Sequence, residues 1–257
     1  MAPARSIHAA RRRYAVWAPP SGLPGHSLNV SRHPCSGHPG DSLTVVQMRG
    51  VPWWGVVSSA VTPVLLIGGW TISAGLQPQP FDPIRQSVST LAGVGAADRW
   101  VMTLAFVVVA ACYIATAVAL RPAALAGRLV LIAAGLAGIL VAASPMAPPG
   151  GFSLAHAFWS ALGFAFLAAW PLASRQHGPM VSWGLRPTPA VGATLVITVL
   201  LAWFLAELIT HGGQIGLAER ALGCAQALWP LLVVLSCRRS RVRYQAWQIR
   251  LRKNAPG

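Results

Sequence analysis

The sequence predicts an all-α membrane protein: a polytopic bundle of six transmembrane helices with a short extracytoplasmic amphipathic helix. Three observations favour this fold class. Only 10% of the 257 residues are charged and 54% are hydrophobic, whereas a soluble domain has about 25% charged residues. Six apolar stretches begin at residue 53, each close to the roughly 20 residues that cross a hydrocarbon core of about 30 Å. The basic residues gather in alternate connectors, as the topology of a multi-pass protein requires.

Residues 1–49 are rich in Pro, Gly, Ser, His and Arg and contain no apolar run long enough for a signal-peptide core. We predict a disordered basic N-terminal extension. Two interpretations stay open. In one, Met48 is the initiator, because "MRGVPWWG" is an ordinary start for a multi-pass protein, and the preceding residues are a mis-called start. In the other, the segment is a genuine cytoplasmic arm that Arg11, Arg12 and Arg13 attract to anionic lipid.

The membrane domain is predicted to cover residues 50–237, with short connectors between the spans. The predicted spans are 53–75, 99–120, 126–144, 154–173, 190–209 and 218–237.

The first connector contains a sequence typical of a short helix. Asp82 and Pro83 stand in the order of an N-cap and a first helical residue, and Gly93 is a typical C-terminal stop. Between them Ile84, Val88 and Leu91 recur at helical spacing. We therefore predict an amphipathic helix at the outer membrane surface, capped by Asp82. Asp98 is predicted to cap the second span in the same way.

Residues 238–257 form a basic tail after the last span. Arg238 and Arg239 end the span, and Tyr244, Trp247 and Leu251 then recur at helical spacing. An amphipathic helix on anionic inner-leaflet lipids fits this pattern. A stop-transfer cluster followed by a loose end fits it equally well.

The net charge of +15 has a topological explanation. The N-terminal segment, the connectors after the second and fourth spans, and the tail are basic, whereas the other three connectors have no basic excess. By the positive-inside rule both termini are cytoplasmic. We predict no nucleic-acid binding from this charge.

Polar residues gather on the predicted outer side. Glu207 and His211 are four apart, which places them on one helix face about one turn below the surface, and His156 and Ser160 form a stripe with Gly163. Ionisable groups at membrane depth are costly and usually face an interior. The candidate outer cluster is Asp82, Arg85, Ser89, Asp98, His156, Ser160, Glu207, His211 and Glu219. Local roles stay open for each residue, such as helix capping, pairing, or reaching the interface.

Four members of this cluster are candidate metal ligands: His156, His211, Glu207 and Asp82. Two histidines and two carboxylates are enough ligands for zinc, which activates water in hydrolases. Their spacing matches no known signature, and HExxH, GxSxG and HxxxH are absent from the sequence. Catalytic residues and cofactors are therefore left unassigned.

Three stretches resemble a known family: "FDPIRQSVSTLAGVGAADRWVMTLAFVVVAACYIATAVAL", "HAFWSALGFAF" and "GLAERALGCAQALWPLLVV". They are similar to domain of unknown function 998, a group of bacterial and archaeal multi-pass membrane proteins. The resemblance covers about residues 53–237, and its most specific element is acid-Pro-x-x-x-x-x-Ser from Asp82 to Ser89. It implies a compact helical bundle in a bacterial cell membrane and brings no established activity. The family often has an acid shortly before the histidine matched by His156, but "SPMAPPGGFSLAH" has none here.

Three functions fit these observations. The first is the handling of a lipid or small molecule in the outer half of the bundle. The second is a structural or regulatory membrane subunit that works through the basic tail and through small-residue helix faces such as Ala134 and Gly138. The third is a metal-dependent, membrane-embedded lipid hydrolase. The lipid bilayer is the expected partner in each case, and the oligomeric state is not specified by the sequence.

Overall fold

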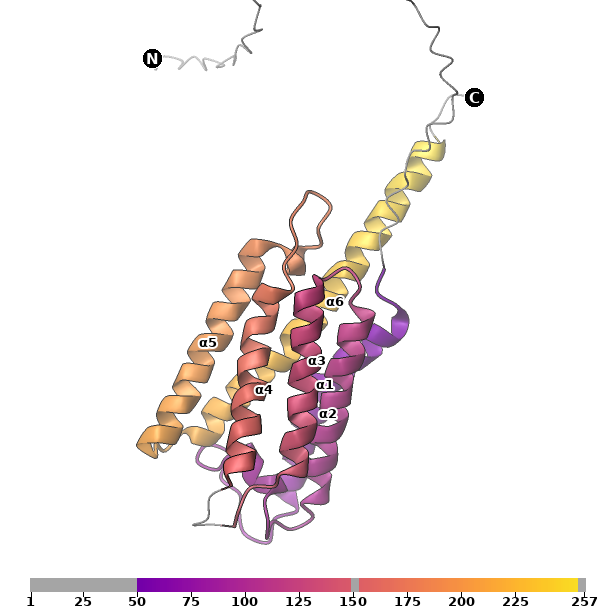
Figure 1. Ribbon diagram of the computed structural model, residues 1–257. Coiled ribbons are helices and arrows are strands. Elements are labelled where there is room, and N and C mark those ends of the chain that lie inside the picture. Colours follow the sequence, from indigo (N-terminus) through magenta and orange to yellow (C-terminus); the bar gives the residue numbers. More distant parts are fainter. Residues whose placement is uncertain (1–49, 149–152, 254–257) are drawn as a thin grey trace, which may run out of the picture. The chain divides into compact units, whose positions relative to one another are not determined.

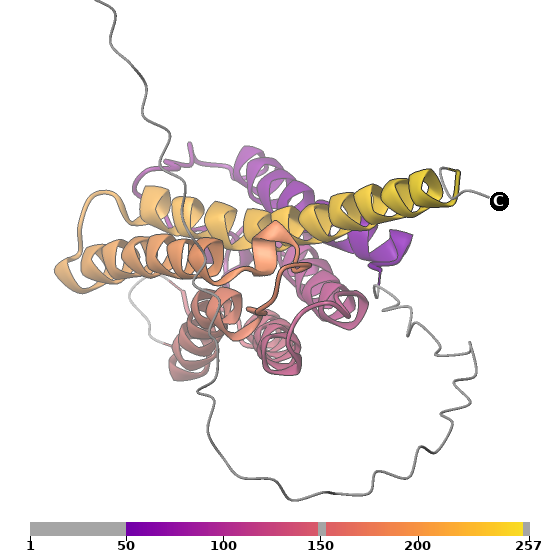
Figure 2. The same cartoon turned by 90° about the horizontal axis from the view of Figure 1, so that it is seen from above.

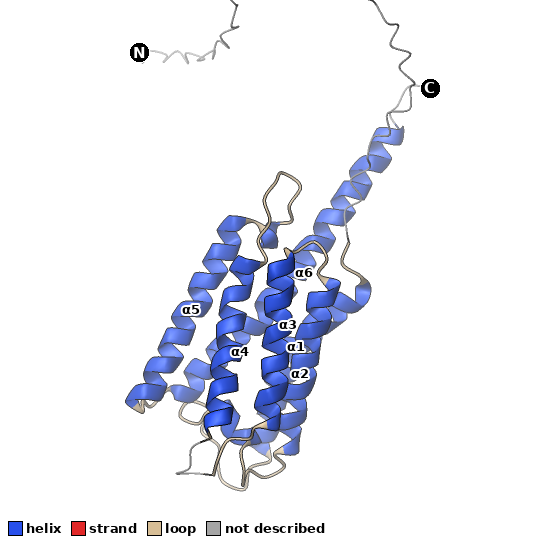
Figure 3. Ribbon diagram, viewed as in Figure 1, coloured by secondary structure: helices blue, strands red, loops and turns tan. Residues whose placement is uncertain are grey.

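The computed structural model describes residues 50–148 and 153–253. The chain divides into two units, Met1–Val45 and Val46–Gly257, and the second is described here. The predictions for residues 1–49 lie outside the described residues. The described part contains six helices that are long and apolar enough to cross a membrane, and it contains no strand (Figures 1 and 3). They are α1 (Trp53–Gly75), α2 (Trp100–Ala119), α3 (Leu125–Ala143), α4 (Leu154–Ala173), α5 (Pro187–Thr210) and α6 (Ile215–Lys253). Two 3-10 helices complete it, η1 (Val88–Ala92) and η2 (Trp183–Leu185).

The six helices form a closed ring. Each helix packs against the next along the chain, and α6 packs against both α5 and α1 (Figure 2). Because successive helices alternate in direction, the connectors after α1, α3 and α5 lie at one end, which we call the acidic end. The connectors after α2 and α4 lie at the other end with the last part of α6, and we call it the basic end (Figure 1).

Small residues bring neighbouring helices together within the ring. A Cβ atom placed on Gly69 of α1 would lie 2.6 Å from the Cβ of Ala105 in α2. A Cβ on Gly135 of α3 would lie 2.7 Å from the carbonyl oxygen of Ala110. Gly138 packs against the same alanine, so the predicted small-residue face of α3 does permit close approach.

The last helix is longer than the predicted span 218–237. It runs for 39 residues, from Ile215 to Lys253, or roughly 58 Å at 1.5 Å per residue. Arginine favours helix, and neither Gly nor Pro interrupts the chain between residues 231 and 253. The basic tail therefore continues the last span as helix, and a loose end directly after Arg239 does not occur.

The first connector differs from its prediction. A short helix is present, but it is η1 alone and not an amphipathic helix from Asp82 to Gly93. Asp82 closes a separate turn, in which its Oδ1 accepts from the N–H of Ile84 at 2.9 Å. The extended backbone of Ser87 (φ −63°, ψ 144°) then interrupts the helical run, and its hydroxyl caps η1. Val88 is 3% exposed, so η1 is inserted into the bundle and does not lie on the membrane surface.

Candidate functional site

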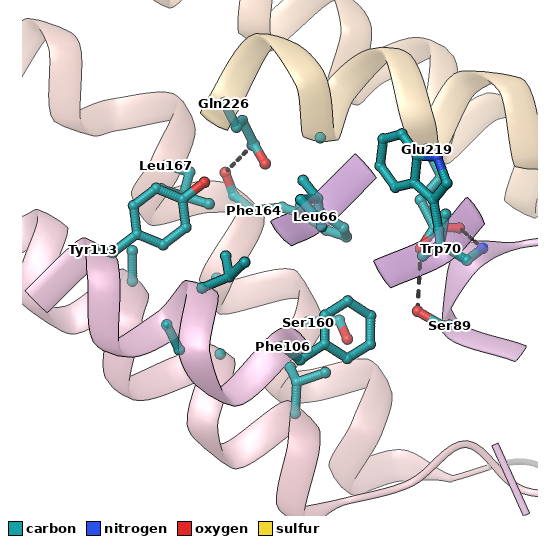
Figure 4. A pocket seen from close by; sticks show the side chains of 18 residues that line it. Leu66, Trp70, Ser89, Phe106, Tyr113, Ser160, Phe164, Leu167, Glu219 and Gln226 are labelled. Carbon is teal, nitrogen blue, oxygen red and sulfur yellow. Dashed lines mark hydrogen bonds between the residues drawn. The ribbon is translucent and has the colours of Figure 1, made fainter. Parts of the chain in front are cut away.

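The first turns of α6 hold the first connector through a buried carboxylate. Glu219 is only 7% exposed. Its Oε2 accepts hydrogen bonds from the Ser87 hydroxyl and the Val88 N–H, both at 2.6 Å. Its Oε1 accepts from the Ser89 hydroxyl at 3.1 Å (Figure 4). Three donors thus replace the water that this carboxylate loses on burial.

The side chain of the next residue, Arg220, binds backbone carbonyls of the same connector. One guanidinium nitrogen, Nη1, donates to the carbonyls of Pro83 at 2.7 Å and Gln86 at 3.1 Å. The guanidinium carbon also lies 5.7 Å from the ring centre of Trp70 and 5.5 Å from that of Phe81. These are distances at which a cation is attracted to an aromatic face.

Gly216 lets the connector lie directly on α6. A Cβ atom at this position would collide with the carbonyl oxygens of Gln86 and Pro83. The N–H of Leu217 also donates to the carbonyl of Ile84 at 3.1 Å. We call this arrangement the connector clamp: residues 83–89 on one side and Gly216, Leu217, Glu219 and Arg220 on the other.

A cavity of about 130 Å³ lies inside the ring, next to the clamp. Its wall comes from α1, η1, α2, α3, α4 and α6 and is mostly apolar. Polar side chains stand at its two ends, Ser89 and Glu219 at one and Tyr113 and Gln226 at the other (Figure 4). The principal apolar side chains are Leu66, Trp70, Phe106, Val109, Phe164 and Leu167.

A hydrogen bond also holds the end of the cavity that contains Gln226. Gln226 is 2% exposed, and its Nε2 donates to the carbonyl of Phe164 at 3.2 Å. That bond ties α6 to α4 across the cavity wall. The amide oxygen of Gln226 and the hydroxyl of Tyr113 make no hydrogen bond to another side chain or carbonyl in residues 50–148 and 153–245. Both oxygens are therefore available to a bound molecule.

The structure brings some of the predicted cluster together at this cavity. Ser89, Ser160 and Glu219 line it, together with Gly163 of the predicted stripe on α4. The remaining predicted residues lie elsewhere: Asp82, Arg85, Asp98, His156, Glu207 and His211. The side chains of the first five have local partners.

Asp82 and Arg85 lie on the exposed side of the connector. Asp82 accepts from the N–H groups of Ile84 and Arg85, and its Oδ2 lies 3.8 Å from the Arg85 Nε. The prediction that the Asp98 side chain caps α2 is wrong. The Asp98 backbone has φ 46°, and its carbonyl accepts from Val101 at 2.9 Å while its carboxylate accepts from the indole of Trp100 at 3.2 Å.

Glu207 and His211 do not share a helix face. The helix ends at Thr210, and His211 takes a left-handed backbone (φ 51°) as its exposed C-cap. The Glu207 carboxylate instead accepts from the N–H of Gln214 at 2.8 Å, immediately before α6. His156 bonds through Nδ1 to the carbonyl of Ser144 at 2.9 Å and joins the start of α4 to the end of α3.

The predicted metal set is not assembled. Within residues 50–148 and 153–253, no three His, Cys, Asp or Glu side chains are grouped closely enough to hold a metal ion. Asp82 lies in the first connector, His156 in the first turn of α4, and Glu207 and His211 at the end of α5. The donors present do not fit a zinc centre.

Comparison with known proteins identifies the family of the chain. The model for the family described as "Protein of unknown function (DUF998)" matches residues 60–236, which is more than half of the chain. The chain belongs to the DUF998 family. The comparisons with curated proteins and with solved structures found no match. The DUF998 region begins in α1 and ends in α6, and it contains both the connector clamp and the cavity.

Four polar residues of this DUF998 site were not predicted as site residues from the sequence. Ser87 and Arg220 belong to the clamp, and Tyr113 and Gln226 belong to the cavity. The acid-Pro motif that contains Ser87, and the charge of Arg220 beside Glu219, were available signals. Tyr113 and Gln226 lie alone in apolar runs, and a single polar residue in a span gives no indication of which cavity it faces.

Proposed function

We propose that this DUF998 protein is an integral membrane protein that binds a lipid or small molecule in the outer half of its helix bundle. The observation that carries the proposal is the cavity of about 130 Å³ inside the ring, apolar along its length and polar at both ends. Ligand sites combine apolar walls with a few placed polar groups in this way.

The size of the cavity limits what it takes. A dry apolar cavity of about 150 Å³ holds a molecule of the size of benzene. A cavity of about 130 Å³ therefore suits a ring, or a segment of an acyl chain, more than a whole lipid. Binding of a lipid would place one such segment inside and the remainder along the helices.

The polar ends define the chemistry of the ligand. Glu219 and Ser89 present oxygens at one end, which suits a hydroxyl or amine donor on the ligand. Gln226 is seven residues further along α6, or about 10 Å at 1.5 Å per residue. An amphiphile with one polar group and an apolar body would satisfy one end and fill the space between.

We place the acidic end outside the cytoplasm, in a bacterial cell membrane. The distribution of charge supports this orientation: Asp82, Asp98, Glu207 and Glu219 are at one end, and the only charged residues in the connectors at the other end are arginines. Basic connectors remain on the cytoplasmic side during insertion. The cavity then lies nearer the outer leaflet, since Glu219 is in the second turn of α6.

The test is to identify molecules that stay bound to the protein in detergent, by extraction and mass spectrometry. The variant Gly163→Leu places a side chain in the cavity, because the glycine lines it and a Cβ there meets only Ala137 at 3.7 Å. Gly192→Leu is the matched control, since Gly192 has open space around it on α5. We expect a near-stoichiometric molecule in the wild type and in Gly192→Leu, and its loss in Gly163→Leu. Equal retention in both variants would contradict the proposal.

A further inference from the structure

The basic end carries many arginines without carboxylate partners. Within the described residues, all four acids are at the acidic end, and the one ion pair joins Arg85 to Asp82 there. The arginines of the basic end whose side chains the structure describes are Arg121, Arg128, Arg175, Arg186, Arg238, Arg239, Arg241 and Arg243. Because no described acid neutralises them, this end of the bundle has a positive potential that attracts anions.

Two of these arginines line one hollow. It lies between the connector after α4 and the part of α6 beyond the predicted span, and it encloses about 360 Å³. The connector contributes Pro179, Met180, Val181 and Arg186, and α6 contributes Ser240, Arg243 and Tyr244. Spacings of three and four residues put these α6 side chains on one helix face, toward the connector. We call this the basic hollow.

Arg186 is oriented for binding. Its Nε donates to the carbonyl of Val181 at 3.1 Å, within its own connector. This bond fixes the plane of the guanidinium and leaves both terminal nitrogens without a partner among the described residues. A planar guanidinium with two free N–H₂ groups matches two oxygens of a phosphate.

Exposed apolar side chains surround the hollow. Met180, which lines it, is 57% exposed, and Trp183, three residues further along the connector, is 52% exposed. Trp beside arginine is typical of the depth at which lipid headgroups lie. This combination favours a lipid over a soluble anion, which would gain nothing from the apolar rim.

We propose that the basic hollow binds the phosphate of an anionic phospholipid in the leaflet at the basic end, with Arg186 and Arg243 as its donors. Met180 contacts the glycerol and upper acyl region of the same lipid. This site is at the opposite end of the bundle from the cavity beside Glu219, and it does not depend on the function proposed for that cavity.

The test measures binding of short-chain phosphatidylglycerol to the full-length protein in detergent by native mass spectrometry. Phosphatidylcholine with the same chains is the zwitterionic comparison. The variant Arg186→Gln with Arg243→Gln removes two charges from the hollow. Arg121→Gln with Arg175→Gln removes two charges from the same end outside it. We expect the first pair to weaken phosphatidylglycerol binding roughly tenfold or more and the second less than about twofold.

Two further variants keep the result interpretable. Arg186→Lys with Arg243→Lys keeps the charge but removes the planar pair of donors, so its binding of phosphatidylglycerol should lie between that of the wild type and that of the double glutamine variant. Arg243→Gln alone serves if the double variant does not fold. An equal loss of phosphatidylglycerol binding in both double glutamine variants would show that the total positive charge of this end attracts the lipid and that no specific site exists. That result would overturn the proposal. Equal binding of phosphatidylcholine by the wild type, or displacement of phosphatidylglycerol by millimolar inorganic phosphate, would overturn it as well.

Discussion

Glu219 is a buried charge that accepts three hydrogen bonds from the first connector. A carboxylate loses several kcal/mol of hydration on burial, and hydrogen bonds to a charged group return about 1.5–3 kcal/mol each. Two 2.6 Å bonds and one 3.1 Å bond reach it from η1 and Ser87. The same bonds fix the position of η1, so Glu219 determines where the cavity ends.

We expect Glu219→Ala to destabilise the protein by about 2–4 kcal/mol, because it leaves the buried Val88 N–H and the half-buried Ser87 and Ser89 hydroxyls without their acceptor. The measurement is the midpoint of thermal unfolding in detergent at one scan rate, followed by tryptophan fluorescence. Asp82→Ala is the control, since Asp82 also accepts two N–H groups but is exposed. A cost for that control of about 1 kcal/mol or less is expected. Equal midpoints for the two variants would show that the clamp adds no stability.

Sequence reasoning identified Glu219 and Ser160 because ionisable and polar groups within membrane spans are unusual, and it identified Ser89 because that residue ends the acid-Pro motif. It misplaced His211 because it assumed that the helix continued through Glu207 to that residue, whereas α5 ends at Thr210. Hydropathy does not indicate where a helix ends in a left-handed C-cap, because a residue can adopt that backbone conformation without any change in the apolar pattern. The predicted set of metal ligands depended on the same assumption, because it placed Glu207 and His211 on one helix face.

At the scale of elements, the first connector and α6 act as one unit. Leu217, Glu219 and Arg220 bind successive parts of residues 83–89, and Gly216 removes the side chain that would separate them. The family motif from Asp82 to Ser89 therefore has a structural meaning in this chain. It forms a turn and then presents Ser87, Val88 and Ser89 as donors to α6.

Gly216→Ala should weaken this unit by about 1–3 kcal/mol, the usual cost of overpacking a close contact. Gly192→Ala is the matched control, because both positions are helical and Gly192 meets nothing within 4 Å. Alanine is the better helix former by about 1 kcal/mol, so the control should be unchanged or more stable. Limited proteolysis of residues 77–99 should be faster in Gly216→Ala alone. If both variants resist protease equally, the connector does not depend on this glycine.

The spans were the most predictable elements. The bounds of α1 and α4 are as predicted, and the other ends differ by three residues or fewer, except the end of α6. Hydropathy marks where the membrane ends, and a helix of arginine-rich sequence continues beyond that point. The nature of η1 was not predictable in this way, because its conformation depends on a carboxylate 131 residues away from Val88.

For the whole molecule, the closed ring and the separation of charge are the main features. The ring leaves a cavity beside the clamp, and it leaves most of α5 exposed, with only Ala190, Ile197 and Phe204 buried along that helix. Charge patterning along the chain predicted which connectors share an end. The ring itself was not predictable, since hydropathy does not specify which helices are neighbours.

The orientation in the membrane is tested by reporter fusions. A periplasm-dependent reporter placed after Gly95, in the acidic-end connector, should be active, and the same reporter after His177 should be inactive. The reverse pattern would place the cavity nearer the cytoplasmic leaflet. It would also move the basic hollow to the outside.

The clamp also sets the order in which this chain matures on the ribosome. The Ser87 hydroxyl and its acceptor Glu219 are 132 residues apart, so at about 5–20 residues per second the donors wait on the order of ten seconds for their partner. Four spans, α2 to α5, are translated during that time while η1 still lacks the carboxylate that holds it. A nascent chain that stops before α6 would contain most of the cavity wall without the contact that closes it, and translation of the last helix is then the step that completes the protein.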